Sequence, residues 1–174
     1  MKTLEYYVDI IPDFPEKGVN FRDITSVISD ADGFRLAIDS LIEHLKGIDF
    51  DIIIGLESRG FIFGAPVAYA LNKPLVLVRK KGKLPKECIS EKYSLEYGTA
   101  VVEIQKDSIK PGQRVVIIDD VIATGGTLKA AANLVERLDG KVTKILSLME
   151  LAGFNGRELL KDYDVDAVLI YEGK

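Results

Sequence analysis

The sequence has few side chains that bind metals or form disulfides, with one cysteine, Cys88, and one histidine, His44, among 174 residues. A lone cysteine cannot form an internal disulfide, and one cysteine with one histidine cannot build a zinc site. His44 falls towards the polar side of a predicted helix, so we expect a surface residue and not a catalyst. This scarcity excludes a disulfide scaffold and a zinc centre.

Long apolar runs and a strong net charge are absent too. No segment approaches the roughly 18 apolar residues of a membrane-spanning helix, and the start, M-K-T-L-E-Y-Y-V-D-I, lacks the apolar h-region of a signal peptide. A net charge of −4 suggests no general affinity for nucleic acids or membranes. We therefore expect a cytoplasmic enzyme whose 174 residues form one domain, 1–174, with a sizeable core.

Two common phosphate-binding patterns are also missing, because neither G-x-x-x-x-G-K-[ST] nor G-x-G-x-x-G occurs. A different Gly-rich stretch is present at 114–127, R-V-V-I-I-D-D-V-I-A-T-G-G-T. Its consecutive β-branched residues at 115–118 predict a strand that is buried on both faces and ends at the two acids. Apolar residues then recur at helical spacing between 128 and 138.

Each part of this unit suits a phosphorylated sugar, although an ordinary turn with two solvated acids has similar local features. A Gly-Gly turn at a helix N-terminus lets backbone N–H groups converge on a phosphate, and the threonines can add hydroxyl donors. The acids can accept from sugar hydroxyls, directly or through a metal ion. The predicted ligands of the phosphate and the ribose are Asp119, Asp120, Ala123, Thr124, Gly125, Gly126 and Thr127.

Further strands are predicted at 52–56, 74–78, 142–149 and 166–171, and further helices at 34–45, 61–71 and 155–161. Asp30 or Asp32 should be the N-cap of the first of these helices, and Pro66 should delay or kink the second. Alternating strands and helices predict an α/β fold with a mostly parallel sheet covered by helices on both faces. Ligand sites are then expected at the carboxyl ends of the strands.

Three other segments depart from a simple alternation. Glu57-Ser58-Arg59-Gly60 offers a hydroxyl, a guanidinium and N–H groups for a second phosphate, although a plain turn with a surface arginine is the alternative. The run R-K-K-G-K at 79–83 suits either a solvated face or a highly charged substrate. The stretch at about 82–110 predicts a flexible antiparallel arm that closes over the site.

Together these segments resemble the type I phosphoribosyltransferases. Residues 114–127 are similar to their motif for phosphoribosyl pyrophosphate (PRPP). F-P-x-x-G-x-x-F-R-D-I at 14–24, S-R-G-F at 58–61, R-K-x-G-K-L-P at 79–85 and Y-S-L-E-Y-G at 93–98 resemble the members that use adenine. The resemblance implies the type I fold with a hood arm, Mg²⁺ as cofactor, a homodimer, and the salvage of adenine with PRPP to give AMP and pyrophosphate.

The resemblance also implies roles for residues that the pattern alone leaves open. The loop at about 12–24 would hold the purine between Phe21 and Leu151, which would equally suit the core. Backbone groups of Asn20 and Arg22 would bind the purine edge, so that a 6-oxopurine would leave buried groups unpaired. Pyrophosphate would contact residues from two segments, some of them in the neighbouring subunit's site: Glu57, Ser58, Arg59, Arg79, Lys80 and Lys83.

A proton on the incoming base must also be managed. The 6-oxopurine relatives have an Asp at the position of Ala123, and the resemblance points here to Glu96 on the arm, with Tyr97 beside it aiding closure. Glu96 as a plain surface acid is the alternative. Enclosure in a dry pocket would raise the pKa of Glu96 and suit it to proton exchange.

Two other functions stay open. A transferase for xanthine or orotate is disfavoured by the 14–24 loop and by Ala123. A PRPP-binding regulator of transcription or RNA is disfavoured by the negative charge and by the lack of an added nucleic-acid module.

Overall fold

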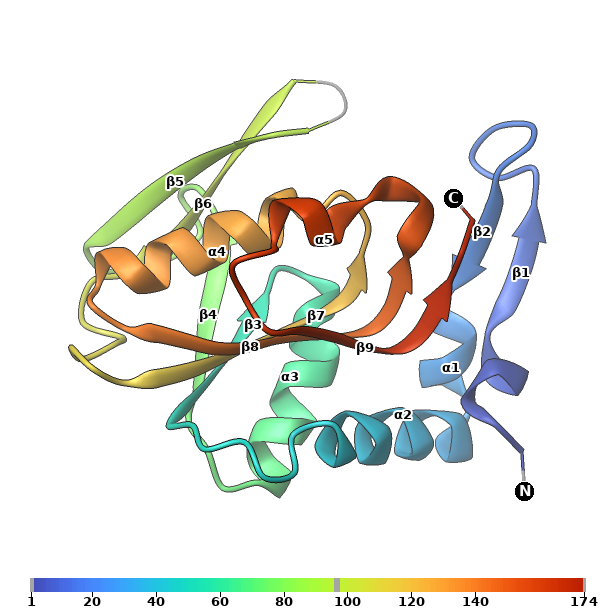
Figure 1. Cartoon of the computed structure of the whole chain (residues 1–174), viewed down its shortest axis with the longest axis horizontal. Helices are drawn as coiled ribbons and strands as arrows, with labels where there is room; N and C mark the ends of the chain where they lie inside the picture. Colours follow the sequence, from blue (N-terminus) through green and yellow to red (C-terminus); the bar gives the residue numbers. More distant parts are fainter. Residues whose placement is uncertain (1, 96–97, 174) are drawn as a thin grey trace.

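The computed structural model describes residues 2–95 and 98–173. Its centre is a seven-stranded sheet in the order β5-β6-β4-β3-β7-β8-β9 (Figure 1). Five neighbouring strands are parallel: β4 (Leu75–Lys80), β3 (Ile52–Leu56), β7 (Arg114–Ile122), β8 (Lys141–Leu151) and β9 (Val165–Tyr171). The antiparallel pair β5 (Cys88–Ser94) and β6 (Thr99–Gln105) forms the predicted arm. The mostly parallel α/β fold is therefore confirmed.

Helices cover both faces of the sheet (Figure 1). One face carries α1 (Thr25–Ser29), α2 (Ala31–Glu43) and α3 (Arg59–Ala70), and the other carries α4 (Gly126–Arg137) and α5 (Gly156–Leu159). Two 3-10 turns are η1 (Leu4–Tyr7) and η2 (Ala152–Phe154). Successive residues of a strand point to opposite faces, so Ile52 and Ile54 pack in the core with α4, whereas Ile53 packs in the core with α2 and α3. This two-sided burial explains the apolar strand sequences.

The helix starts follow local chemistry. The Asp30 carboxylate accepts from the backbone N–H groups of Asp32 and Gly33, both at 2.9 Å, so Asp30 is the N-cap of α2. Pro66 lies inside α3, yet this helix begins at Arg59. The predicted late start was therefore wrong, since the proline falls well past the first turn.

Several predicted boundaries differ from the structure. Strand β7 continues to Ile122, so Asp119 and Asp120 lie within it and do not follow it. Arg79 and Lys80 likewise belong to the end of β4. The segment at 12–24 is not irregular throughout, because β1 (Asp9–Pro12) pairs with β2 (Asn20–Asp23) as an antiparallel hairpin. Backbone pairing with neighbouring strands determines where these strands begin and end, and the pattern of apolar residues does not show which segments pair.

His44 is more engaged than its pattern suggested. Its Nδ1 atom lies 2.7 Å from Asp166 Oδ2, and its side chain is 31% exposed. It therefore joins the end of α2 to β9 as a half-buried residue. In the described part of the chain, no helix has the length and apolar character needed to cross a membrane.

Candidate functional site

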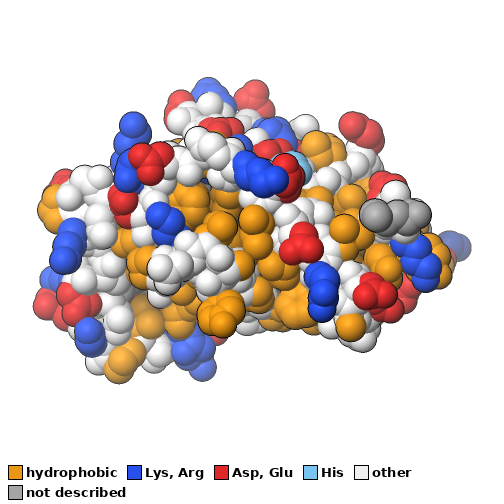
Figure 2. All heavy atoms as spheres, turned by 90° about the horizontal axis from the view of Figure 1, so that it is seen from below, with side chains coloured by type: hydrophobic (Ala, Val, Ile, Leu, Met, Phe, Trp, Pro, Cys, Tyr) orange, Lys and Arg blue, Asp and Glu red, His pale blue; other side chains and the backbone are white. Residues whose placement is uncertain are grey.

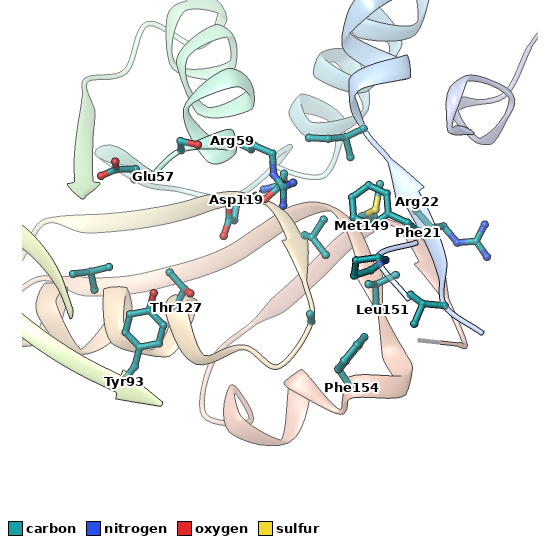
Figure 3. Close-up of a pocket in the computed structure, with 18 of the residues that line it drawn as sticks. Phe21, Arg22, Glu57, Arg59, Tyr93, Asp119, Thr127, Met149, Leu151 and Phe154 are labelled. Carbon is teal, nitrogen blue, oxygen red and sulfur yellow. Dashed lines mark hydrogen bonds and ion pairs between the residues drawn. The ribbon is translucent and has the colours of Figure 1, made fainter. Parts of the chain in front are cut away.

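A large cavity opens at the carboxyl ends of β3, β7 and β8 (Figure 3). Its volume is about 670 Å³, within the range of small-molecule sites. The β1–β2 hairpin contributes Asn20 and Phe21 to its wall, the arm contributes Tyr93, and the start of α3 contributes Ser58 and Arg59. Segments from the whole length of the chain thus meet at one edge of the sheet.

A smaller hollow of about 100 Å³ lies at the N-terminus of α4. The T-G-G-T loop, Thr124, Gly125, Gly126 and Thr127, lines it together with Ala123. Gly125 has a φ of 81°, a left-handed conformation that glycine adopts without a Cβ clash, and this turn directs the chain into the helix. The first N–H groups of a helix have no intrahelical partners, so the hollow suits an anion.

The acidic pair lies where the two hollows meet, because Asp119 lines both of them. Asp120 is buried, and the Nε atom of Arg59 lies 2.6 Å from its Oδ2. Asp119 Oδ1 accepts the backbone N–H of Asp120 at 2.9 Å. Burial, followed by the neighbouring Asp120 carboxylate, raises the pKa of Asp119 above its ordinary value. Hydroxyl donors or a cation from a ligand would therefore favour the charged form of Asp119.

The predicted pyrophosphate residues are only partly brought together. Glu57, Ser58, Arg59 and Lys80 line the cavity, whereas Arg79 is held by Glu57, with Nε–Oε2 at 3.2 Å and Nη2–Oε1 at 3.4 Å. Burial by itself would raise the pKa of Glu57, but the Lys80 N–H and the Arg79 guanidinium outweigh it and lower the pKa. A carboxylate held in its charged form repels an anion, so the Glu57 side chain suits holding Arg79 better than binding pyrophosphate.

The far end of the cavity is apolar (Figure 3). Phe21 on β2 lies near Met149 and Leu151 on β8, and Phe154 of η2 completes this wall. The Arg22 side chain points away, and its guanidinium lies 3.9 Å from the centre of the Tyr171 ring. The backbone of Arg22 is therefore the part that remains for a ligand.

Gly156 joins this apolar wall to the phosphate loop. A Cβ added to Gly156 would lie 2.2 Å from the Ala123 carbonyl oxygen, and one added to Gly125 would lie 2.9 Å from the Gly156 carbonyl oxygen. Arg157 then donates from Nε at 2.9 Å and from Nη2 at 2.7 Å to the buried Glu150 carboxylate. The segment 150–157 is thus fixed against the back of the phosphate loop.

Most of the residues selected from the sequence line one of the two hollows. Arg79 and Lys83 do not line either hollow. Glu96 and Tyr97 lie outside the described residues. Residues that the sequence did not single out also line the large cavity: Tyr93, Val102, Val121, Met149 and Phe154. Tyr93 is the first residue of the Y-S-L-E-Y-G motif, so the sequence could have identified it. Apolar strand residues indicate burial but do not show that they face a cavity.

Comparisons with known proteins agree with this geometry. Residues 28–171 match the model of the phosphoribosyl transferase domain. The adenine phosphoribosyltransferases of Agathobacter rectalis and Lachnoclostridium phytofermentans are 66% and 61% identical to this chain over 174 residues, and both chains are covered in full in each comparison.

Solved structures give the same result. The crystal structure of adenine phosphoribosyltransferase from Thermoanaerobacter pseudethanolicus has a TM-score of 0.92 and 49% identity, over 97% of this chain and 98% of that chain. The Saccharomyces cerevisiae enzyme, complexed with an imino-altritol bisphosphate and adenine, has a TM-score of 0.89 and 40% identity, over 95% and 96% of the two chains. This chain therefore belongs to the phosphoribosyl transferase family and, within it, to the adenine phosphoribosyltransferases.

Proposed function

We propose that this chain transfers the 5-phosphoribosyl group of PRPP to adenine, which gives AMP and pyrophosphate and salvages the purine. The observation that carries the proposal is the arrangement of the two hollows, which adjoin at the acidic pair and end in an apolar wall. The small hollow would hold the phosphate, the acidic pair the ribose and the apolar wall the base, which is the order of these groups in AMP. Adenine phosphoribosyltransferases that match all or nearly all of this chain add independent support.

The reaction itself requires mainly positioning and charge. Adenine N9 attacks C1 of the ribose, the bond from C1 to the pyrophosphate oxygen breaks, and its electron pair leaves with pyrophosphate. The transition state has oxocarbenium character, so water must be kept away from C1. Backbone N–H groups of the 124–127 loop would hold the 5-phosphate, while Asp119 and Asp120 accept from the ribose hydroxyls. Burial raises the pKa of Asp119, and hydrogen bonds from the ribose hydroxyls would stabilise its charged form.

Base selection is proposed to rest on the backbone of the hairpin. A carbonyl there would accept from the exocyclic amine of adenine, and an N–H would donate to a bare ring nitrogen. Asn20, Phe21, Arg22 and Leu151 all line the cavity, and Phe21 and Leu151 would cover the two faces of the ring. A 6-oxopurine has the opposite donor and acceptor pattern and would leave buried groups unpaired.

Mg²⁺ is the proposed cofactor. Among residues 2–95 and 98–173, no group of three or more His, Cys, Asp and Glu side chains could hold a metal ion. Mg²⁺ usually keeps several waters and binds through one or two carboxylates and the substrate's phosphates. Asp119 and Asp120 line the cavity and could supply these two carboxylates. The residues fit a cation that arrives with PRPP, and its chemistry would be to neutralise charge on the leaving pyrophosphate.

Glu96 is proposed to exchange the proton of the base, with Tyr97 beside it in the closed arm. This role rests on the Y-S-L-E-Y-G motif, since both residues lie outside the described part of the chain. Ala123 supports it, because this residue lines both hollows and its methyl group cannot exchange a proton. The acid–base group must then come from another segment.

We also infer a cytoplasmic homodimer in which Arg79 and Lys83 serve the partner's site. In the single chain Arg79 is tied to Glu57, and Lys83 lines neither hollow. Hydrophobic side chains gather on the side of the molecule seen in Figure 2, and Tyr69 of α3 is 90% exposed. The free thiol of Cys88 is compatible with a reducing compartment.

Subunit mixing tests the shared site. Arg79→Ala and Asp120→Asn subunits, mixed under conditions where subunits exchange, should regain part of the activity through hybrid dimers. No recovery despite demonstrated exchange would indicate sites built from one chain.

The activity is tested by a spectrophotometric assay with PRPP, Mg²⁺ and each nucleobase in turn. We expect AMP from adenine and no comparable turnover of hypoxanthine, guanine, xanthine or orotate. Comparable turnover of one of these other bases would refute the specificity. A purified protein that forms no nucleotide at all would refute the transferase assignment.

A further inference from the structure

The arm is joined to the rest of the molecule at two places. Strand β6 pairs with β4 at Arg79↔Glu103 and Lys80↔Val102, and Val102 and Ile104 of β6 are buried in the core. Strand β5, at the edge of the sheet, lies along α4, the helix that begins at the phosphate loop (Figure 1). The contacts between β5 and α4 therefore contribute to the position of the arm over the cavity.

A cluster of polar contacts holds the two elements together near the C-terminal end of α4. Glu91 of β5 accepts from Asn133 Nδ2 at Oε1, at 3.0 Å, and its Oε2 lies 3.0 Å from Arg137 Nη1. The same Nη1 atom donates to the Ser90 carbonyl at 2.6 Å. Asn133 and Arg137 are four residues apart and so share one face of the helix. We call these three residues, Glu91, Asn133 and Arg137, the arm latch.

The next side chains of β5 lie over the phosphate loop. Tyr93 is two residues after Glu91 and projects from the same face of the strand. Its Cδ2 atom is 3.4 Å from where a Cβ on Gly126 would lie, and the Ser94 carbonyl oxygen is 3.2 Å from that point. Tyr93 lies beside Thr127 in the cavity wall (Figure 3). Strand β5 thus extends from the latch at one end of α4 to the phosphate loop at the other.

The register of β5 on α4 matters because alternate residues of a strand point to opposite sides. A shift of one residue would place Lys92 or Ser94 where Tyr93 now completes the wall. The latch side chains are partly exposed, with 24% for Glu91 and 48% for Arg137, so their ion pair contributes little to global stability.

We propose that Glu91, acting through Asn133 and Arg137, is a positioning residue that fixes the arm on α4 and so sets Tyr93 over the phosphate loop. Its consequence is tighter binding of a ligand with a 5-phosphate on the ribose. The kinetic part of this inference rests on the proposed function, whereas the position of the arm does not.

Kinetics of latch variants provide the first test. Glu91→Ala should raise the KM for PRPP about threefold, the scale of one partly exposed ion pair, while the melting temperature stays close to that of the wild type. Arg137→Met should have a similar effect, and the double variant should lose less than the sum of the two single losses, because both single variants remove the same Glu91–Arg137 contact. Asp107→Asn is the matched control, because it removes an exposed ion pair of the same arm, Lys86–Asp107, that includes none of the latch residues, and its kinetics should match the wild type.

Hydrogen–deuterium exchange gives a readout that is independent of activity. The backbone amides of 88–94 should exchange faster in Glu91→Ala than in the wild type or in Asp107→Asn. Ribose 5-phosphate should protect the 124–128 amides less in Glu91→Ala at equal concentration. Unchanged exchange together with an unchanged KM would overturn the proposal, as would additive effects of the two latch variants. If the wild type formed no AMP, the proposed function would fail, but the exchange comparison would still decide the role of the latch.

Discussion

Gly156 provides the most direct perturbation of the site, because it touches the phosphate loop from behind. In Gly156→Ala the new Cβ would lie 2.2 Å from the Ala123 carbonyl oxygen. Carbon–oxygen contacts are tolerated at about 3.3 Å and beyond, so the two segments must separate by about 1 Å. Either the phosphate loop or the apolar wall at Leu151 has to move, and both line the cavity.

The magnitude follows from that displacement. A shift of about 1 Å in a substrate-positioning element can cost about 100-fold in rate, which corresponds to about 2.7 kcal/mol of transition-state stabilisation. Overpacking should also destabilise the fold by about 1–3 kcal/mol. For a chain of this size that loss lowers the melting temperature by about 2–12 °C.

The assay is the initial rate of AMP formation at 25 °C, well below the melting transition, with PRPP and adenine varied in turn. We expect kcat/KM to fall for both substrates, because the displaced contact joins both subsites. Gly140→Ala is the matched control, since its Cβ would lie 2.9 Å from Val135 Cγ1, away from the cavity, and should reduce stability without changing kcat/KM. Wild-type kinetics for Gly156→Ala, or an equal loss in Gly140→Ala, would refute the reasoning.

Four further predictions concern charge and the cofactor. Asp119→Asn should remove most of the activity while the protein stays folded, and full activity would leave this acid with a structural role only. Glu96→Gln should lower kcat by about 10²–10⁴-fold with little change in apparent substrate affinities. A wild-type kcat, measured where chemistry is rate-limiting, would refute the assignment. Hydrogen bonds from the Arg114 side chain and then its backbone N–H lower the pKa of Asp51 from 3.8 to about 2, so this stabilisation is full above the ordinary pKa and is lost as the pH falls towards 2. The difference in melting temperature between wild type and Asp51→Asn should therefore narrow between about pH 4 and 2, and a difference that ignores pH would contradict this. EDTA should abolish turnover but leave the melting temperature of the ligand-free protein unchanged, whereas a fall would reveal a resident metal.

Features carried by consecutive residues were predictable from the sequence. The predicted strand, Gly-rich loop and helix of this region occur in that order in the structure, although the acidic pair lies inside the strand, and Gly125 has the left-handed conformation that its turn needs. Asp30 caps α2 as a short polar side chain at a helix start should. These features depend on local sterics and hydrogen bonding, so neighbouring residues are sufficient to specify them.

Strand limits and the hairpin were not predictable in the same way. Strand β7 continues past the acidic pair because β8 pairs with it as far as Ile122↔Glu150. The prolines and glycine at 12–18 indicated a loop, yet residues on either side pair across it as β1 and β2. The ends of a strand depend on the neighbouring strand that pairs with it, and the sequence of one strand does not identify that neighbour.

The sequence by itself determined the chemistry available to this protein: a phosphate loop, two carboxylates and apolar residues within motifs of one family. Only the tertiary structure decided which of these side chains reach a common cavity. The Arg22 guanidinium stacks on Tyr171, which leaves its backbone for the predicted purine contact, and Arg79 is held by Glu57 in the single chain. Residue type and spacing specify what a group can do, but its position depends on contacts between residues far apart in the chain, and those contacts form only when the sheet assembles.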